Sequence, residues 1–156
     1  MQHLKWSVSH AVFVTEIDDE HREIFDVVGK LQTALAAGAT SMELREITER
    51  LIACAQGHFA HEERLMRASR YGSFAWHKRQ HDTARRRVQQ LVPQIDQGDS
   101  AAGAALVEFL TSWLRDHTRL ADRMLGAFLR NRNLGKLTIR ATTKPTNQHH
   151  EDVAGR

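Results

Sequence analysis

The chain has 156 residues, of which 41% are hydrophobic and 26% are charged. This length and composition predict a single globular domain and exclude a low-complexity or fibrous protein. No apolar run reaches the roughly 18 residues that a membrane-spanning helix needs, and the N-terminus lacks the apolar segment of a secretory signal. We therefore expect a cytoplasmic protein with no membrane partner. Cys54 is the only cysteine, so an intramolecular disulfide is excluded.

The formal net charge of +3 is unevenly distributed along the chain. Residues 130–156 contain six Lys or Arg and two acidic residues, whereas residues 1–129 contain 16 basic and 17 acidic residues. The excess positive charge therefore lies in the C-terminal segment. Because no basic stripe is interleaved with aromatic residues, we expect no nucleic-acid partner.

Hydrophobic residues recur at helical spacing in four segments, and strand-like alternation is scarce. The expected helices begin at Asp18, after Thr40, near Ser73 and at Asp99 or Ser100. Gly38 is the expected stop of the first helix, and Thr40 with Glu43 forms a capping box for the second. Short connections make neighbouring helices antiparallel. The sequence predicts an all-α, up-down-up-down antiparallel four-helix bundle.

Two segments extend beyond the predicted helices. Residues 1–16 are expected to form an irregular N-terminal arm, anchored by Trp6, Val12 and Phe13. Residues 131–156 are polar, basic and weakly periodic, which predicts a flexible C-terminal tail. The predicted domain therefore covers residues 1–130, including the arm.

Side chains that bind metals occupy inward positions on all four predicted helices. These residues are His21, His58, Glu62, His77, His81 and His117. Residues four apart on a helix are offset by only about 40°, so His58 points with Glu62 and His77 points with His81. Burying an imidazole or a carboxylate without a partner is costly. Their convergence on one interior therefore indicates a metal centre.

Asp122 is a further candidate that fits the helical periodicity poorly. It follows His117 by five positions, an offset of about 140° on an ideal helix. The inner face expected for the fourth helix continues instead through Leu120, Met124 and Phe128. Asp122 would reach the centre if the helix loosens locally or the metal pair extends sideways. Periodicity alone does not select it.

The chemistry of these donors favours a pair of non-haem iron ions. Imidazole and carboxylate without thiolate suit iron better than structural zinc. Five imidazoles, two bridging carboxylates and one bridging oxo or hydroxo group fill about 11 of the roughly 12 positions around two octahedral ions. One position is then open for a ligand.

In these motifs the chain resembles the hemerythrin-like proteins, specifically the single-domain bacteriohemerythrins. The resemblance runs from Trp6 to about Leu129. It rests on Ile17-Asp18-Asp19-Glu20-His21, on His58-Phe59-Ala60-His61-Glu62-Glu63 with Met66, on Tyr71 with His77-Lys78-Arg79-Gln80-His81, and on Trp113-Leu114-Arg115-Asp116-His117 with Asp122. All seven ligand positions of the family carry the expected residue type.

The resemblance implies reversible O2 binding at a di-iron centre with a bridging oxo or hydroxo group. By resemblance, one iron is held by His77, His81 and His117, the other by His21 and His58, and both are bridged by Glu62 and Asp122. The O2 pocket is expected to be lined by Ile24, Phe59, Trp113, Leu114 and Thr118.

Three positions near these motifs call for separate expectations. Thr118 stands where the family usually has isoleucine, and a hydroxyl near bound O2 predicts faster autoxidation. Glu20 replaces a usual glutamine and is not expected to touch the ligand set. Glu63 is expected to point outward into solvent.

Carriage, storage or scavenging of O2 is the function these features favour. The alternatives are an O2 or redox sensor, a di-iron oxidase or peroxidase, and a protein that repairs iron centres under nitrosative stress. Ferritin-like di-iron sites carry Glu-x-x-His pairs, whereas this chain has the reverse order in His58 and Glu62. We therefore expect no enzymatic role beyond a weak side activity. We also expect a monomer, whose protein partner would consume O2 or signal.

Overall fold

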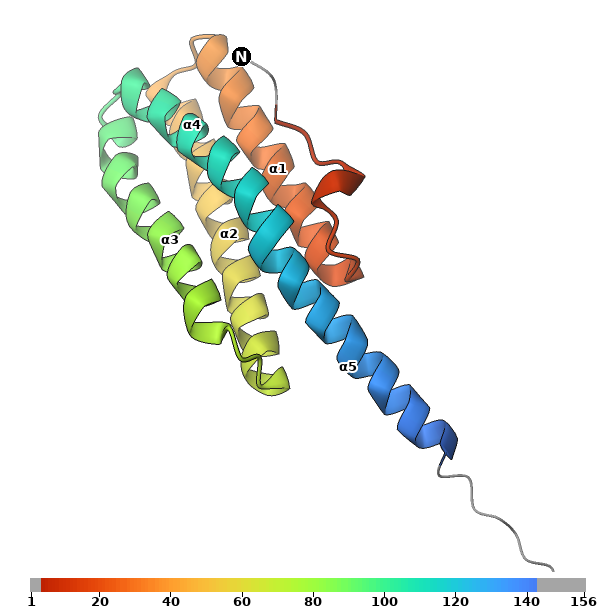
Figure 1. Cartoon of the computed structure of the whole chain (residues 1–156). Helices are drawn as coiled ribbons and strands as arrows, with labels where there is room; N and C mark the ends of the chain where they lie inside the picture. The colour runs from red at the N-terminus through yellow and green to blue at the C-terminus, as the bar shows by residue number, and fades with distance from the viewer. Residues whose placement is uncertain (1–3, 143–156) are drawn as a thin grey trace, which may run out of the picture.

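The computed structural model describes residues 4–142, and the side chains of residues 4–133. Its α-helices are α1 (Thr15–Ala36), α2 (Ser41–Ser69), α3 (Phe74–Asp96), α4 (Ser100–His117) and α5 (Arg123–Thr142). The described residues contain no β-strand. Figure 1 shows α1 to α4 side by side with alternating direction, and α5 continuing from α4 past the end of the bundle. The predicted four-helix bundle is confirmed.

The start of α1 differs from the prediction. The helix begins at Thr15, one turn before Asp18, so Asp18 is not its N-cap. The Asp18 carboxylate instead accepts hydrogen bonds from the backbone N–H groups of Val12, at 2.8 Å, and Phe13, at 3.0 Å. Asp18 therefore ties the N-terminal arm to the first turn of the helix. Sequence periodicity could not distinguish these two uses of the same carboxylate.

The other predicted helix ends are confirmed. Thr40 donates its backbone N–H to Glu43 Oε2 at 2.8 Å, and its hydroxyl accepts from the Glu43 N–H, which completes the capping box. Asp99 accepts from Ala101 N–H at 2.8 Å at the start of α4. Gly38 follows α1 with a φ of +71°, a conformation that glycine adopts without a Cβ penalty.

A π-helical turn at Thr118–Asp122 joins α4 to α5. Such a turn holds an extra residue compared with an α-turn, so it shifts the face that later residues present to the core. Leu120 and Met124, which were expected on the inner face, are 57% and 45% exposed, so that expectation is wrong. Asp122 and Leu125 are buried in their place. The local loosening that Asp122 required is therefore present.

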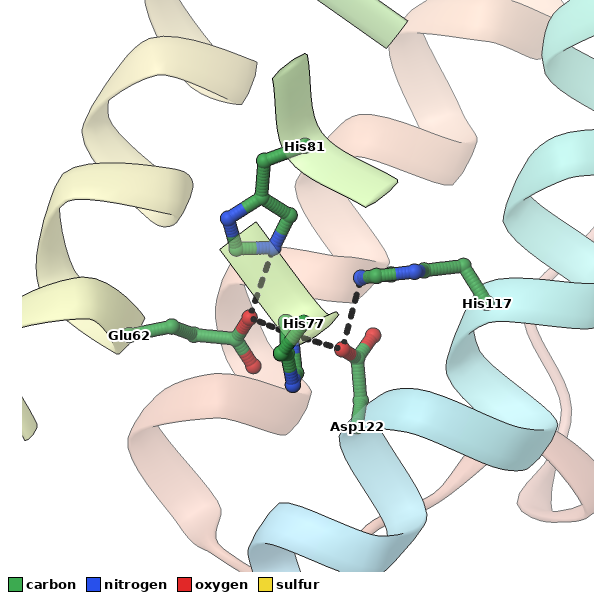
Figure 2. A group of neighbouring side chains, drawn as sticks. All are labelled: Glu62, His77, His81, His117 and Asp122. Carbon is green, nitrogen blue, oxygen red and sulfur yellow. Dashed lines mark hydrogen bonds and ion pairs between the residues drawn. The ribbon is translucent and has the colours of Figure 1, made fainter. Parts of the chain in front are cut away.

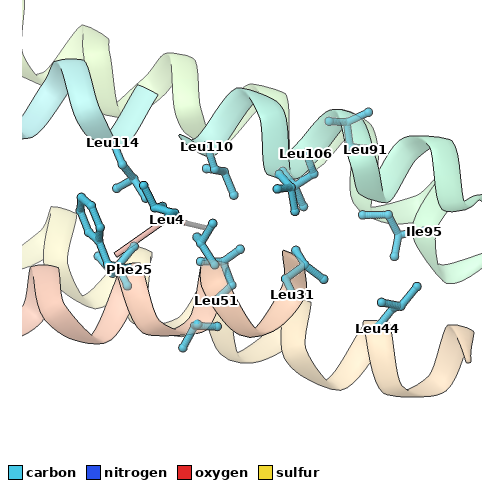
Figure 3. Packing of buried hydrophobic residues seen from close by; sticks show 14 of the residues in the cluster. Leu4, Phe25, Leu31, Leu44, Leu51, Leu91, Ile95, Leu106, Leu110 and Leu114 are labelled. Carbon is cyan, nitrogen blue, oxygen red and sulfur yellow. The ribbon is translucent and has the colours of Figure 1, made fainter. Parts of the chain in front are cut away.

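The apolar core is divided into two clusters. The larger cluster fills the bundle between all four helices, as Figure 3 shows for residues such as Leu31, Leu51 and Leu106. The smaller one contains Met66, Tyr71 and Leu125. Along α2, His58 and Glu62 lie between Leu51 of the larger cluster and Met66 of the smaller one. The π turn likewise lies between Leu114 of the larger cluster and Leu125 of the smaller one. The bundle thus has a polar layer between two apolar ones.

The N-terminal arm packs against α5 and the π turn. Val12 is fully buried, as expected of an anchor, but Phe13 is 59% exposed, so its anchoring role is wrong. Arg123 donates to the Ala11 carbonyl at 3.3 Å, and Arg130 donates to the Val12 carbonyl. A Cβ on Gly126 would lie 2.5 Å from the same Val12 oxygen, so this close approach requires glycine.

The C-terminal part is more helical than expected. The predicted domain boundary at residue 130 falls inside α5, which continues to Thr142. The rest of the predicted flexible tail, residues 143–156, lies outside the described residues. No helix in the described part of the chain is long and apolar enough to span a bilayer.

Candidate metal centre

The structure brings all seven predicted ligand residues into the polar layer. They come from all four helices and the π turn: His21 from α1, His58 and Glu62 from α2, His77 and His81 from α3, His117 from α4, and Asp122 from the π turn. None of the seven is more than 5% exposed. Solvent therefore cannot compensate their charges, and each must find its partner inside the bundle.

These residues form two overlapping groups of donor atoms, each lying within 4.8 Å of one another. The first group comprises Glu62, His77, His81, His117 and Asp122, and the second comprises His21, His58, Glu62 and Asp122. The two groups share both carboxylates. Such sharing is the arrangement expected for two neighbouring cations bridged by carboxylates.

Figure 2 shows the first group, in which both carboxylates meet three histidines. Glu62 Oε2 lies 3.2 Å from Nε2 of both His77 and His81. Asp122 Oδ1 lies 3.1 Å from His77 Nε2 and 2.9 Å from His117 Nε2. Each imidazole therefore turns its Nε2 atom toward the carboxylates at the centre of the group.

The second group contacts the same two carboxylates, Asp122 through its other oxygen and Glu62 through the same Oε2. His21 Nε2 lies 3.1 Å from Asp122 Oδ2 and 3.2 Å from His58 Nε2. His58 Nε2 lies 3.7 Å from Glu62 Oε2. Asp122 thus directs one oxygen to each group. This orientation depends on the π turn, since a continuous α-helix would offset Asp122 from His117 by about 140°.

The unsatisfied atoms of the centre fit a pair of cations. Buried side-chain atoms without a hydrogen-bond partner among the described residues include both Asp122 oxygens, Glu62 Oε1, His81 Nε2 and His117 Nε2. Leaving a buried polar atom unpaired costs about 1–3 kcal/mol. All of these atoms can donate a lone pair to a metal, and none is a thiolate. The donor set therefore suits two iron ions.

The ionisation of the metal-free centre reflects the same crowding. Burial and Asp122 would raise the pKa of Glu62, but the surrounding histidines outweigh them and lower that pKa to about 2. Burial would lower the pKa of His77, but the adjacent carboxylates of Asp122 and Glu62 raise that pKa to about 9. Both groups are therefore charged at neutral pH, and a proton on His77 occupies the position that a cation would take.

Two carboxylates outside the predicted set contact ligand histidines. Glu20 accepts from Nδ1 of His58 at 2.9 Å, so the expectation that it does not touch the ligand set is wrong. Glu63 is buried and lies 3.3 Å from Nδ1 of His81, so the expectation that it is solvated is also wrong. A ligand histidine needs a hydrogen-bond acceptor for its outer N–H. Glu20 and Glu63 are each adjacent in sequence to a predicted ligand, which could have indicated them as candidate acceptors.

Four of the five expected O2-pocket residues line one cavity of about 250 Å³. Its walls include Ile24, Phe59, Trp113 and Leu114. The rings of Phe59 and Trp113 stack on His81 and His117, with centroids 4.1 and 4.2 Å apart. Two side chains in the cavity wall therefore contact ligand imidazoles directly.

Thr118, the fifth expected pocket residue, does not line that cavity. Its side chain is fully buried, and its hydroxyl donates to the Leu114 carbonyl at 2.8 Å. The hydroxyl proton is therefore engaged within the helix, one turn back along the chain.

The architecture and donor set agree with comparisons to known proteins. Residues 12–129, which include all seven candidate ligands, match the Hemerythrin HHE cation binding domain family. The chain belongs to the hemerythrin family. It is 32% identical over 112 residues to the bacteriohemerythrin of Methylococcus capsulatus, an alignment that covers 72% of this chain and 85% of that relative.

Other hemerythrins are similarly related. The hemerythrin of Themiste dyscrita is 31% identical over 117 residues, covering 75% of this chain and 86% of the relative. A solved structure of a hemerythrin mutant matches with a TM-score of 0.75 and 28% identity, covering 83% of this chain and 98% of that one. The hemerythrin fold thus extends over most of the described residues.

Proposed function

We propose that this hemerythrin-family chain binds O2 reversibly at a non-haem di-iron centre and acts as an O2 carrier, store or scavenger. The observation that carries the proposal is the pair of donor groups that share Glu62 and Asp122. A mononuclear site would not need two groups bridged by both carboxylates. When bound, two Fe(II) ions supply the two electrons that reversible O2 binding requires.

The ligand assignment follows the two groups. His77, His81 and His117 would hold one iron, and His21 and His58 would hold the other. Glu62 and Asp122 belong to both groups and would therefore contribute to both irons, together with an oxo or hydroxo group. The second group supplies one histidine fewer than the first, which would leave room for O2 beside His21 and His58.

The side chains around the centre protect bound O2 from water. Both carboxylates are fully buried, and the adjacent cavity has mostly apolar walls, including Ile24, Phe59 and Leu114. A small apolar molecule enters such a space without losing hydrogen bonds to water, whereas a proton or hydroxide would be desolvated. We therefore assign the cavity to O2.

The relatives favour O2 binding over the other functions that the sequence left open. They carry the names hemerythrin and bacteriohemerythrin, which denote O2-binding proteins and not enzymes. The sensor, the oxidase or peroxidase and the repair protein are therefore not preferred. We propose that the protein works as a cytoplasmic monomer whose partner consumes O2 or signals.

Iron stoichiometry tests the shared carboxylates directly. We expect two Fe(II) per wild-type chain after anaerobic loading and removal of free iron. Asp122→Asn removes the charge that both irons share and should reduce retention to one iron or fewer. Asp116→Asn is the matched control, because this aspartate is exposed in α4, just before the π turn that carries Asp122, and should leave the stoichiometry at two. Two irons retained by Asp122→Asn, or one iron in the wild type, would overturn the proposal.

A further inference from the structure

Two ligand histidines, one in each donor group, are held from outside by a carboxylate. The outer nitrogen of His58, Nδ1, lies 2.9 Å from Glu20 Oε2. The outer nitrogen of His81 lies 3.3 Å from Glu63 Oε1. Glu20 comes from α1 and Glu63 from α2, so the two contacts arise from different helices and are independent.

These contacts determine which nitrogen of each ring is free to bind a metal. A carboxylate can only accept a hydrogen bond from an imidazole, so the hydrogen of each ring lies on Nδ1. The Nε2 lone pairs then face inward, where His58 Nε2 is 3.7 Å and His81 Nε2 is 3.2 Å from Glu62 Oε2. Glu20 and Glu63 therefore orient their rings toward the centre.

The counter-charges on the two carboxylates differ. Glu63 Oε1 forms an ion pair at 2.9 Å with the guanidinium of Arg85, which also contacts Asp82. Glu20 contacts His61 Nδ1 at 2.7 Å, and no described Lys or Arg forms an ion pair with it. One carboxylate is thus neutralised by a permanent cation, and the other is shared between two histidine N–H groups.

Building on the proposed function, we propose that Glu20 and Glu63 are positioning residues whose unequal counter-charges make the two iron positions electronically unequal. The uncompensated carboxylate Glu20 polarises His58 toward imidazolate, so this ring donates more electron density to its metal. Arg85 neutralises the charge of Glu63, so Glu63 polarises the His81 ring less than Glu20 polarises His58. The iron held by His58, where O2 is proposed to bind, is then the one more easily oxidised.

The midpoint reduction potential of the iron-loaded protein tests this inference, because opposite substitutions have opposite effects. Glu20→Gln keeps a hydrogen-bond acceptor but loses the charge, so it should raise the potential. Arg85→Met keeps the apolar stem but removes the nearer of the two cations that pair with Glu63, the other being Arg67 at 3.7 Å, so it should lower the potential. Glu23→Gln is the control, since Glu23 lies on the same helix, is half-exposed and pairs with Arg50 away from the ligands. It should leave the potential unchanged.

The positioning role of Glu20 can also be tested through the exchange of the His58 Nδ1–H with solvent. In Glu20→Ala, the exchange of the His58 N–H with solvent, followed by NMR of the di-iron(II) form, should accelerate about tenfold or more. Iron release to a chelator should accelerate by about 10–100-fold. Glu20→Gln, which retains an acceptor, should keep slow exchange.

Shifts of the same sign in Glu20→Gln and Arg85→Met, or shifts no larger than that of Glu23→Gln, would overturn the inference. A wild-type protein that binds iron but not O2 would overturn only the proposed function, because the potentials can still be compared. A wild-type protein that binds no iron would overturn both.

Discussion

At the scale of single residues, the metal centre places two buried carboxylates among five histidine side chains. Glu62 and Asp122 are fully buried, and the carboxylate of each is surrounded by imidazoles. The histidines lower the pKa of Asp122 well below its usual range despite its burial, which alone would raise it. Without metal, these carboxylates therefore stay ionised, and His77, whose pKa is raised to about 9, stays protonated at neutral pH.

The stability of the metal-free protein should depend on pH in a defined way. The pKa of His77 is raised from 6.5 to about 9, so its contribution is complete below pH 6.5 and is lost as pH rises to 9. The pKa of Glu62 is lowered from 4.5 to about 2, so its contribution is complete above pH 4.5 and is lost as pH falls to 2. In urea unfolding of the metal-free protein, both contributions should be complete together between pH 4.5 and 6.5, and the lowered pKa of His81 should oppose them as pH falls below 6.5.

Iron-loaded protein is the control for this pH dependence. A bound metal requires neutral imidazoles, so the loss of stability between pH 6.5 and 9 should disappear on loading. A metal-free protein equally stable at pH 6.5 and 9 would contradict the charge arrangement described for His77.

Thr118 gives a second prediction at the residue scale. The sequence alone suggested that its hydroxyl would act on bound O2. In the structure this hydroxyl already donates its proton to the Leu114 carbonyl, so it cannot donate that proton to O2. Thr118→Val should leave the autoxidation rate of the oxygenated form unchanged and should cost about 1 kcal/mol of stability through the lost hydrogen bond. A several-fold slower autoxidation in Thr118→Val would restore the original expectation of a hydroxyl that accelerates it.

Spacing identified the candidates His21, His58, Glu62, His77, His81 and His117, because helical periodicity directly determines which side chains share a face. It did not find the contacts of Glu20 and Glu63. Those depend on where the outer nitrogen of a ring from another helix lies, which is a tertiary distance. Periodicity carries no information about that distance.

At the scale of elements, the π turn is the feature that adapts a regular bundle to the metal centre. It places Asp122 beside His117 and sends Leu120 and Met124 to the surface. Periodicity assumed a continuous α-helix and therefore assigned the wrong inner face after His117. The resemblance to hemerythrins supplied Asp122, but the cause lay in a local helix geometry that propensities do not encode.

The register after the π turn can be checked by the stability of three variants. Leu125→Ala should destabilise the protein by about 2–5 kcal/mol, because Leu125 is fully buried. Leu120→Lys and Met124→Lys should change stability by no more than about 0.5 kcal/mol, because both side chains are exposed. Chemical denaturation at fixed pH measures all three. The reverse order of effects would indicate a continuous α-helix.

The ends of the helices were predictable to different degrees. Thr40, Asp99 and Gly38 act through contacts within a few residues, so their roles follow from local sequence. Asp18 was misassigned because its carboxylate can serve either a helix start or the backbone of a preceding segment. The choice between them is made by the arm, which α5 holds through Arg123 and Gly126.

At the scale of the whole molecule, the metal centre lies between two apolar clusters and connects every helix of the bundle. The larger cluster lies on one side and Met66, Tyr71 and Leu125 lie on the other. Side chains from α1, α2, α3, α4 and the π turn all meet at the centre. Two bound irons would therefore hold together elements that the apolar clusters also pack, and would stabilise the folded state by linkage.

The central claim is that this centre binds O2 reversibly, and the absorption spectrum of the iron-loaded protein tests it most directly. The protein would be loaded with two Fe(II) per chain without oxygen, exposed to O2, and then returned to an oxygen-free gas. The account predicts charge-transfer bands that appear with O2 and disappear when it is removed, over repeated cycles. Irreversible oxidation at the first exposure, or no bands at all, would contradict it.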